Sequence, residues 1–195
     1  PTSDMSHILQ DLPLGQAVAI AIAGGLDARA AREWRRAEGA VRRVPDGLSL
    51  RDGCVYRGCS YTAWHALHKC ARVQPGDRVL VHSAAGAVGL MAMQIARDAG
   101  ATPLGLCGGP RKVEWVRSFG FDAVVDYAEA GWPDVARERN GGRGFDVILD
   151  GNGGDAAVHN YALAATLGRI VYLGAMAGAN PQPVSVDVLI ARSIS

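Results

Sequence analysis

A glycine-rich turn at residues 83–89 (SAAGAVG) has the residue types and spacing of a phosphate site in this 195-residue sequence. It follows an apolar run at residues 78–82 and leads into a segment of helical periodicity. Small residues let the backbone approach a pyrophosphate, and the first N–H groups of a helix offer it hydrogen bonds. Gly86 and Gly89 match the second and third glycines of G-x-G-x-x-G, and Ala84 stands at the first. We predict a nucleotide phosphate site here; the alternative is a merely structural turn.

The segment after the second apolar run indicates which dinucleotide fits. An NAD site carries an acidic residue about 20 residues after the turn, where it binds the ribose 2′-hydroxyl. Residues 107–112 read CGGPRK, with two small residues, the cations Arg111 and Lys112 and no carboxylate. Cations bind a 2′-phosphate, whereas a carboxylate repels it. The segment favours NADP(H) over NAD(H) and speaks against an S-adenosylmethionine methyltransferase; alternatively, the two cations belong to an ordinary helix start.

Two later glycine-rich segments fall where further strands end. Residues 145–154 (FDVILDGNGG) contain Asp150 and three glycines, and residues 169–178 (RIVYLGAMAG) contain Gly174. Ligands of open α/β sheets lie outside the carboxyl ends of the strands. We therefore expect the nicotinamide half of the dinucleotide at these turns, unless the glycines serve the turns alone.

Short apolar runs alternate with helical segments and predict an α/β fold with a doubly wound parallel sheet, a Rossmann-type dinucleotide-binding domain. The expected strands are 78–82, 103–107, 123–125, 146–149 and 169–173, and the expected helices are 61–71, 87–99, 111–119, 132–139 and 155–166. Residues 27–43, rich in Ala, Arg and Glu, predict an N-terminal helical extension. We divide the chain into a segment of unclear fold at 1–43 and the nucleotide-binding domain at 44–195.

Composition and charge exclude several classes of protein. With 49% apolar residues and a net charge of +1, the chain is neither disordered nor suited to nucleic acid. It has no apolar run of the ~18 residues that a membrane span requires. The four cysteines lack zinc-site spacing and are too sparse for a disulfide scaffold, so we expect reduced thiols, a cytoplasmic location and no metal. No nucleophile elbow or paired carboxylate indicates hydrolysis, and the catalytic residues stay unknown.

Several segments together carry a family resemblance. They are Val44–Ser49, Tyr61–Leu67, Val73–Asp77, Val79–Gly89, Gly108–Lys112, Val125–Tyr127 and Phe145–Gly154. Over about residues 44–195 the sequence resembles the cofactor domain of the zinc-independent quinone oxidoreductases, in the medium-chain dehydrogenase/reductase superfamily. Its Ala-Ala-Gly-x-Val-Gly turn is typical of that branch, although Ala87 replaces the family's usual Gly.

The resemblance implies an NADPH-dependent oxidoreductase that transfers a hydride to a quinone, an enone or an enoyl thioester without a metal. It implies a small-molecule substrate, either a quinone or an activated alkene, and a homodimer formed through sheet edges. The implied cofactor-binding residues are Thr62, Ala85, Gly86, Ala87, Val88, Gly108, Lys112, Tyr127, Leu173 and Gly174. Two alternatives stay open: a non-catalytic NADP(H)-binding module, and the enoyl reductase portion of a polyketide or fatty-acid synthase.

The sequence also departs from the family pattern. Residues 1–43 do not resemble the family's GroES-like domain, which supplies much of the substrate pocket. The family continues past residue 195, and its next strand would begin near residues 192–194. We therefore expect a domain truncated at its C-terminal end, and the substrate is not identified by the residues present.

Overall fold

The computed structural model describes residues 18–19, 42–178 and 186–195. The chain divides into two compact units, Pro1–Gly58 and Cys59–Ser195, and each is described by itself. In the first unit, β1 (Val18–Ala19) pairs antiparallel with β2 (Arg42–Arg43). The predicted 27–43 helix lies outside the described residues, except that Arg42 and Arg43 belong to β2 rather than to a helix. The domain boundary that we place at residue 44 stays a prediction.

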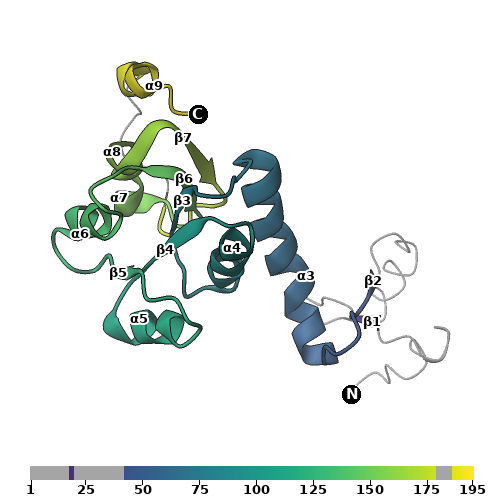
Figure 1. The fold of residues 1–195 in the computed structure, drawn as a ribbon. Coiled ribbons are helices and arrows are strands. Elements are labelled where there is room, and N and C mark those ends of the chain that lie inside the picture. Colours follow the sequence, from purple (N-terminus) through teal and green to yellow (C-terminus); the bar gives the residue numbers. More distant parts are fainter. Residues whose placement is uncertain (1–17, 20–41, 179–185) are drawn as a thin grey trace. The chain divides into compact units, whose positions relative to one another are not determined.

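Helix α3 (Leu50–Trp64) begins in the first unit and continues in the second as the π-helix η2 (His65–Cys70) (Figure 1). Ser49 caps its start, because the Ser49 hydroxyl accepts a hydrogen bond from the Asp52 N–H at 3.1 Å. The predicted helix over 61–71 is therefore the second half of a longer helical segment, whose last turns follow the wider π pattern.

The second unit is built on a five-stranded parallel sheet of order β5-β4-β3-β6-β7 (Figure 1). The strands are β3 (Arg78–Val81), β4 (Thr102–Cys107), β5 (Val124–Asp126), β6 (Phe145–Asp150) and β7 (Ala164–Tyr172). The strand order reverses between β3 and β6, which makes the crevice beside β3 the switch point where such sheets bind ligands. This topology confirms the predicted doubly wound fold.

Helices cover both faces of the sheet, because alternate strand residues point to opposite sides. Val79 and Val81 join one core cluster with residues of η2, α4 (Ala87–Asp98) and α5 (Pro110–Arg117). Leu80 joins a second cluster, which includes residues of α6 (Trp132–Arg139) and α8 (Asn160–Leu163). Both faces of this parallel sheet are therefore buried.

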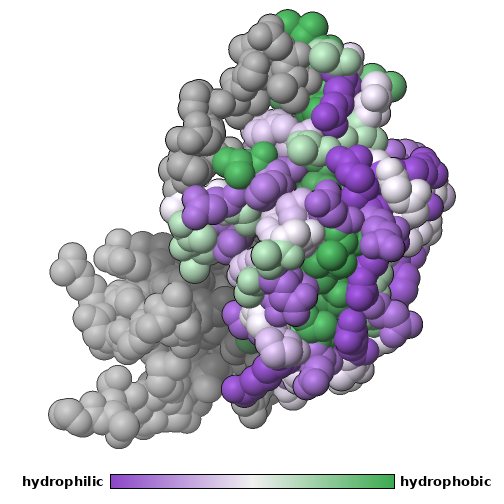
Figure 2. All heavy atoms as spheres, turned by 90° about the vertical axis from the view of Figure 1, so that its left-hand side faces the viewer, coloured by the Kyte–Doolittle hydropathy of each residue, from purple (hydrophilic) through white to green (hydrophobic). Residues whose placement is uncertain are grey.

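The side of the molecule shown in Figure 2 is mostly hydrophilic, with hydrophobic residues in several smaller areas. Helices α5 and α6 bury part of their apolar residues against the sheet, where Val116 and Ala136 are fully buried, while Trp115 and Val135 stay exposed. No helix in the described part of the chain is long and apolar enough to cross a membrane.

The single helix predicted over 155–166 is wrong. Two short helices replace it, α7 (Gly154–Ala157) and α8, and β7 begins at Ala164. Asn160, the first residue of α8, is fully buried and donates a hydrogen bond to the buried Asp150 side chain at 2.7 Å. A buried carboxylate must have polar partners, so this tertiary contact outweighs the helical propensity of the alanines nearby.

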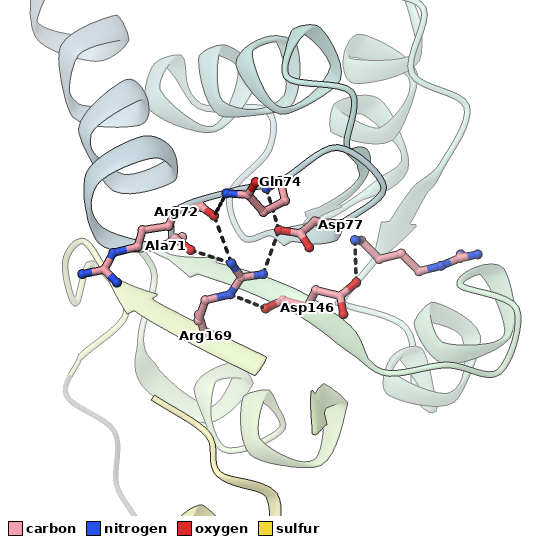
Figure 3. Close-up of polar contacts among 7 residues, drawn as sticks. Ala71, Arg72, Gln74, Asp77, Asp146 and Arg169 are labelled. Atoms are coloured by element: carbon pink, nitrogen blue, oxygen red, sulfur yellow. Dashed lines mark hydrogen bonds and ion pairs between the residues drawn. The ribbon is translucent and has the colours of Figure 1, made fainter. Parts of the chain in front are cut away.

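Arg169 of β7 joins several segments near the amino ends of the strands (Figure 3). Its guanidinium donates to the Ala71 and Arg72 carbonyls at 2.8 and 3.1 Å, just after η2, and pairs with the Asp77 carboxylate at 2.7 Å. Its Nε also donates to the Asp146 carbonyl at 3.3 Å. One side chain thus ties the end of η2 and the turn before β3 to the sheet, on the edge opposite the glycine-rich turn.

The chain's last described segment packs along β7. Helix α9 (Val186–Arg192) ends at Arg192, whose guanidinium donates to the Tyr161, Ala162 and Ala164 carbonyls. Ser195 then exchanges hydrogen bonds with residues 168 and 170 at 3.1 and 2.8 Å. These two hydrogen bonds are typical of a strand that pairs parallel with β7. The pairing therefore begins at Ser195, slightly later than the strand start expected near 192–194.

Candidate functional site

The glycine-rich turn lies between β3 and α4, at the carboxyl end of the sheet. Gly86 is the N-cap of α4 and has no side chain to cap it, while its own N–H donates to the Ser83 carbonyl at 2.8 Å. The first amides of a helix have no partner within the helix. The amides of Ala87 and Val88, the first two residues of α4, are therefore in place for an anionic ligand.

Two glycines near this turn permit close backbone contact. A Cβ at Gly89 would collide with the Ser83 carbonyl oxygen and lie 2.8 Å from the Ala84 Cα. A Cβ at Gly105 of β4 would lie 2.8 Å from the Ala84 Cβ. The third glycine of the turn is thus required for packing α4 against the chain, and Ala84 occupies a site with little spare room.

An open pocket of about 670 Å³ extends from the turn to α5. Its lining residues come from four places: the turn, the end of β4, one side of α5 and the residue after β5. They are Ser83, Ala85, Gly86, Cys107, Gly108, Arg111, Lys112, Glu114, Trp115, Ser118 and Tyr127. Five residues predicted to bind the cofactor thus line one pocket, namely Ala85, Gly86, Gly108, Lys112 and Tyr127.

Arg111 and Lys112 bring positive charge to the far end of the pocket, and both are exposed. Glu114 is the one acidic residue in the pocket lining. A second carboxylate, Asp126 at the end of β5, accepts hydrogen bonds from the Gly109 and Ala128 amides at 2.8 and 2.9 Å. Sequence reasoning missed Asp126 as a neighbour of the β4 end, because the two residues meet only through strand pairing.

Small residues at the end of β4 shape the pocket wall. A Cβ at Gly108 would lie 3.0 Å from the Tyr127 ring, so the phenol packs directly on the glycine. The neighbouring Cys107 thiol is buried, and burial together with the Asp126 charge raises its pKa to about 11. Cys107 is therefore a neutral thiol at physiological pH and not a reactive nucleophile.

Ala87 and Val88 directly follow the lining residue Gly86, whereas Leu173, Gly174 and Thr62 belong to other parts of the chain and do not line the pocket. Leu173 and Gly174 follow β7, and the Leu173 N–H donates to the Asp150 carbonyl at 2.7 Å. A Cβ at Gly174 would lie 3.2 Å from the Gly151 carbonyl oxygen, so these residues lie beside the loop after β6. Thr62 is an exposed residue of α3. Their contacts with a nicotinamide stay predictions.

Buried polar side chains form a cluster at the carboxyl ends of β3 and β6, beside the switch point. His82 Nε2 lies 2.8 Å from the Asn160 side-chain oxygen, and Asn160 donates to Asp150. Asp150 also accepts the Asn152 and Gly153 amides at 2.8 and 2.9 Å, which holds the loop after β6. Burial lowers the pKa of His82, although the nearby Asp150 charge opposes this shift. His82 is therefore a neutral ring that helps to shape the loop.

Sequence reasoning did not assign Ser83, Glu114, Trp115 or Ser118 to the site. For Glu114, Trp115 and Ser118, the spacing within the helix expected at 111–119 indicated that they belong to the site. Residues 111, 114, 115 and 118 share one side of such a helix, so the assignment of the two cations to a ligand already implied the others.

Together, the order reversal at β3, the open α4 N-terminus and the pocket beside Arg111 and Lys112 define a Rossmann-type dinucleotide-binding domain. Residues 87–195, more than half of the chain, match the family of zinc-binding dehydrogenases, and the chain belongs to this family. Although the family description names zinc, the described residues contain no group of three or more His, Cys, Asp or Glu side chains that could hold a metal ion. We therefore derive no step through zinc.

Three similar proteins illustrate the family's range. The phthioceranic/hydroxyphthioceranic acid synthase of Mycobacterium tuberculosis is 37% identical over 131 residues, which is 67% of this chain and 6% of that protein. The CurK enoyl reductase is 30% identical with a TM-score of 0.69, aligning 80% of this chain with 46% of its own. The quinone oxidoreductase of Thermus thermophilus, solved also with NADPH, is 32% identical with a TM-score of 0.68 over 80% of this chain and 49% of its own. This chain thus spans less than half of each of these proteins.

Proposed function

We propose that this chain is the NADP(H)-binding domain of an oxidoreductase that reduces quinones or activated carbon–carbon double bonds. The observation that carries the proposal is a single pocket that joins the open N-terminus of α4 to Arg111 and Lys112. Such a pocket suits a dinucleotide with an extra phosphate on its adenosine ribose. Bound NADPH supplies the hydride, and the chain's residues bind and orient it.

In this proposal, the two ends of the pocket bind different parts of the dinucleotide. At the turn, the amides of Ala85, Ala87 and Val88 hold the pyrophosphate, and Gly86 leaves room for it. At α5, Lys112 binds the 2′-phosphate, with Gly108 and Tyr127 beside the ribose. The comparison with a quinone oxidoreductase solved with NADPH supports this arrangement.

The nicotinamide would extend from the pyrophosphate toward the switch point. There Leu173 and Gly174 present apolar surface and backbone beside the loop that Asp150 holds, and the family resemblance adds Thr62 of α3. A small residue such as Gly174 lets a flat ring lie against the main chain.

The substrate class has two candidates. A quinone or enone is supported by the similarity to a quinone oxidoreductase, and an enoyl thioester by the similarity to CurK enoyl reductase and to polyketide synthases. We favour reduction of an activated alkene, which both classes share. We further propose that the protein works in the cytoplasm, and that any homodimer forms through sheet edges, both of which stay predictions.

The test is a titration of this chain with NADPH and NADH, read by nicotinamide fluorescence and by the melting temperature. A ligand that binds the folded state alone stabilises it by about 2.7 kcal/mol at 100 times its Kd. We expect NADPH to bind well ahead of NADH, and Lys112→Glu to weaken NADPH binding roughly tenfold or more. Lys69→Glu is the matched control, because Lys69 is the chain's other lysine and lies outside the pocket lining.

Equal binding of NADH and NADPH, or equal losses in Lys112→Glu and Lys69→Glu, would refute the assignment of the 2′-phosphate site. Substrate classes are separated by NADPH oxidation with a quinone, an enone and an enoyl thioester of N-acetylcysteamine. Binding of NADPH without oxidation of it by any of these would favour a non-catalytic module.

A further inference from the structure

Trp115 is a large aromatic side chain that the described fold leaves open to a pocket. Its exposed fraction is 53%, although it lines the pocket together with Arg111 and Lys112. Phe119, one turn further along the chain, lies 4.9 Å from it between ring centroids, with the two ring planes at 78°. This edge-to-face pair supports the indole from one side and fixes its position.

The position of Trp115 on α5 relates it to the phosphate-binding end. Arg111 and Trp115 are four residues apart and share one side of the helix, about 6 Å apart along its axis. This separation is comparable to that between a 2′-phosphate and the base on the same ribose. The other aromatic lining residue, Tyr127, packs its ring on Gly108, so it has less free surface to offer a base.

We propose that Trp115, supported by Phe119, is the stacking surface for the adenine of a 2′-phosphorylated adenosine ligand. This inference rests on the proposed function and extends it to the adenine base, which none of the predicted site residues was assigned to contact. A purine stacks favourably on an indole, and a half-exposed indole gains contact area when a base covers it. Trp115 would then act with Lys112 in selecting the adenosine half of the cofactor.

The experiment uses 2′,5′-ADP, which contains the adenosine 2′-phosphate but no nicotinamide. Because this ligand does not absorb tryptophan emission, energy transfer to it cannot cause quenching, and the Trp115 and Trp64 variants identify the indole that is quenched. We expect 2′,5′-ADP to quench the wild-type emission and NADPH to compete for the same site. Trp115→Ala should weaken both ligands by about 5- to 150-fold. Trp115→Phe should keep binding within a few-fold but lose the quenching.

The matched control is Trp64→Phe. Trp64 has a similar exposed fraction, 42%, but lies on α3 outside the pocket lining. Its replacement should leave both the affinity and the quenching unchanged. If NADPH binds and Trp115→Ala binds it as tightly as wild type, the stacking inference is wrong while the proposed function stands. If neither NADPH nor 2′,5′-ADP binds the wild-type chain, the proposed function itself fails, and this inference with it.

Discussion

Replacement of Arg169 by alanine tests whether one side chain secures the amino edge of the sheet (Figure 3). The change removes the guanidinium from the Ala71 and Arg72 carbonyls and from the Asp77 carboxylate, all within 3.1 Å. Water can partly replace it, because the Arg169 and Asp77 side chains are 24% and 14% exposed. These contacts join segments that are more than 90 residues apart in the sequence.

The magnitude follows from the number and quality of the lost bonds. A hydrogen bond that involves a charged group contributes about 1.5–3 kcal/mol net, and solvent access reduces this. The two shortest bonds, at 2.7 and 2.8 Å, should dominate, while the one to the Asp146 carbonyl at 3.3 Å adds little. We expect Arg169→Ala to lower the free energy of unfolding by about 2–4 kcal/mol. Arg169→Lys should recover about half of the loss, because an ammonium can pair with Asp77 but cannot reach both sides of the cluster.

The measurement is urea unfolding of the full chain followed by circular dichroism, with linear extrapolation to water. Arg139→Ala is the control, since Arg139 makes one long bond, at 3.3 Å, to the Val124 carbonyl. It should cost about 0.5 kcal/mol or less, as ordinary surface substitutions do. A loss of that same size in Arg169→Ala would refute the reasoning, and so would full stability in Arg169→Lys.

Four further predictions concern the site, the residues that support it and helix α3. Glu114→Gln should tighten NADPH binding a few-fold at low salt and less at high salt, because it removes the one carboxylate from the pocket lining; isothermal titration at two salt concentrations checks this. The lowered pKa of His82 means that the unfolded chain binds more protons below pH 6.5. Its contribution to stability is therefore complete above that pH and is lost as the pH falls, by up to about 1.4 kcal/mol per pH unit; the pH slope of urea unfolding should flatten in His82→Gln. Gly89→Ala should cost about 2–3 kcal/mol in the same assay, because its Cβ meets the Ser83 backbone. Gly58→Ala, in a helix with nothing within 4 Å of the added Cβ, should instead stabilise the chain by about 0.5–1 kcal/mol.

Much of the nucleotide-binding half could be predicted from local pattern. The strand at 78–82 and the turn at 83–89 could both be recognised, because a buried strand and a helix N-terminus each depend on the residue types in a short, contiguous stretch of sequence. The helix predicted at 132–139 has the same bounds as α6 in the structure. The doubly wound arrangement also follows, because right-handed crossovers leave few arrangements for alternating strands and helices; the order of the strands comes from the structure.

The wrong prediction of a single helix at 155–166 shows where the local sequence pattern is not sufficient to predict the structure. Ala-rich sequence favours one helix there, but the structure has two short helices, the second beginning at the buried Asn160 that contacts Asp150, and β7 starts at Ala164. A buried polar group without a partner costs more free energy than a turn of helix contributes. No pattern within the segment reveals that its partner lies at the end of a different strand.

The sequence by itself therefore determined the parallel α/β fold, the glycine-rich turn between a strand and a helix, and the position of two cations after the second strand. The tertiary structure decided which side chains share the pocket, namely that Trp115 and Glu114 join Lys112 and that Asp126 holds the Gly109 amide. The physical reason is the range of the interactions. Strand and helix periodicity and turn propensity act over a few neighbouring residues, whereas a pocket is formed by residues that only strand pairing and packing bring together.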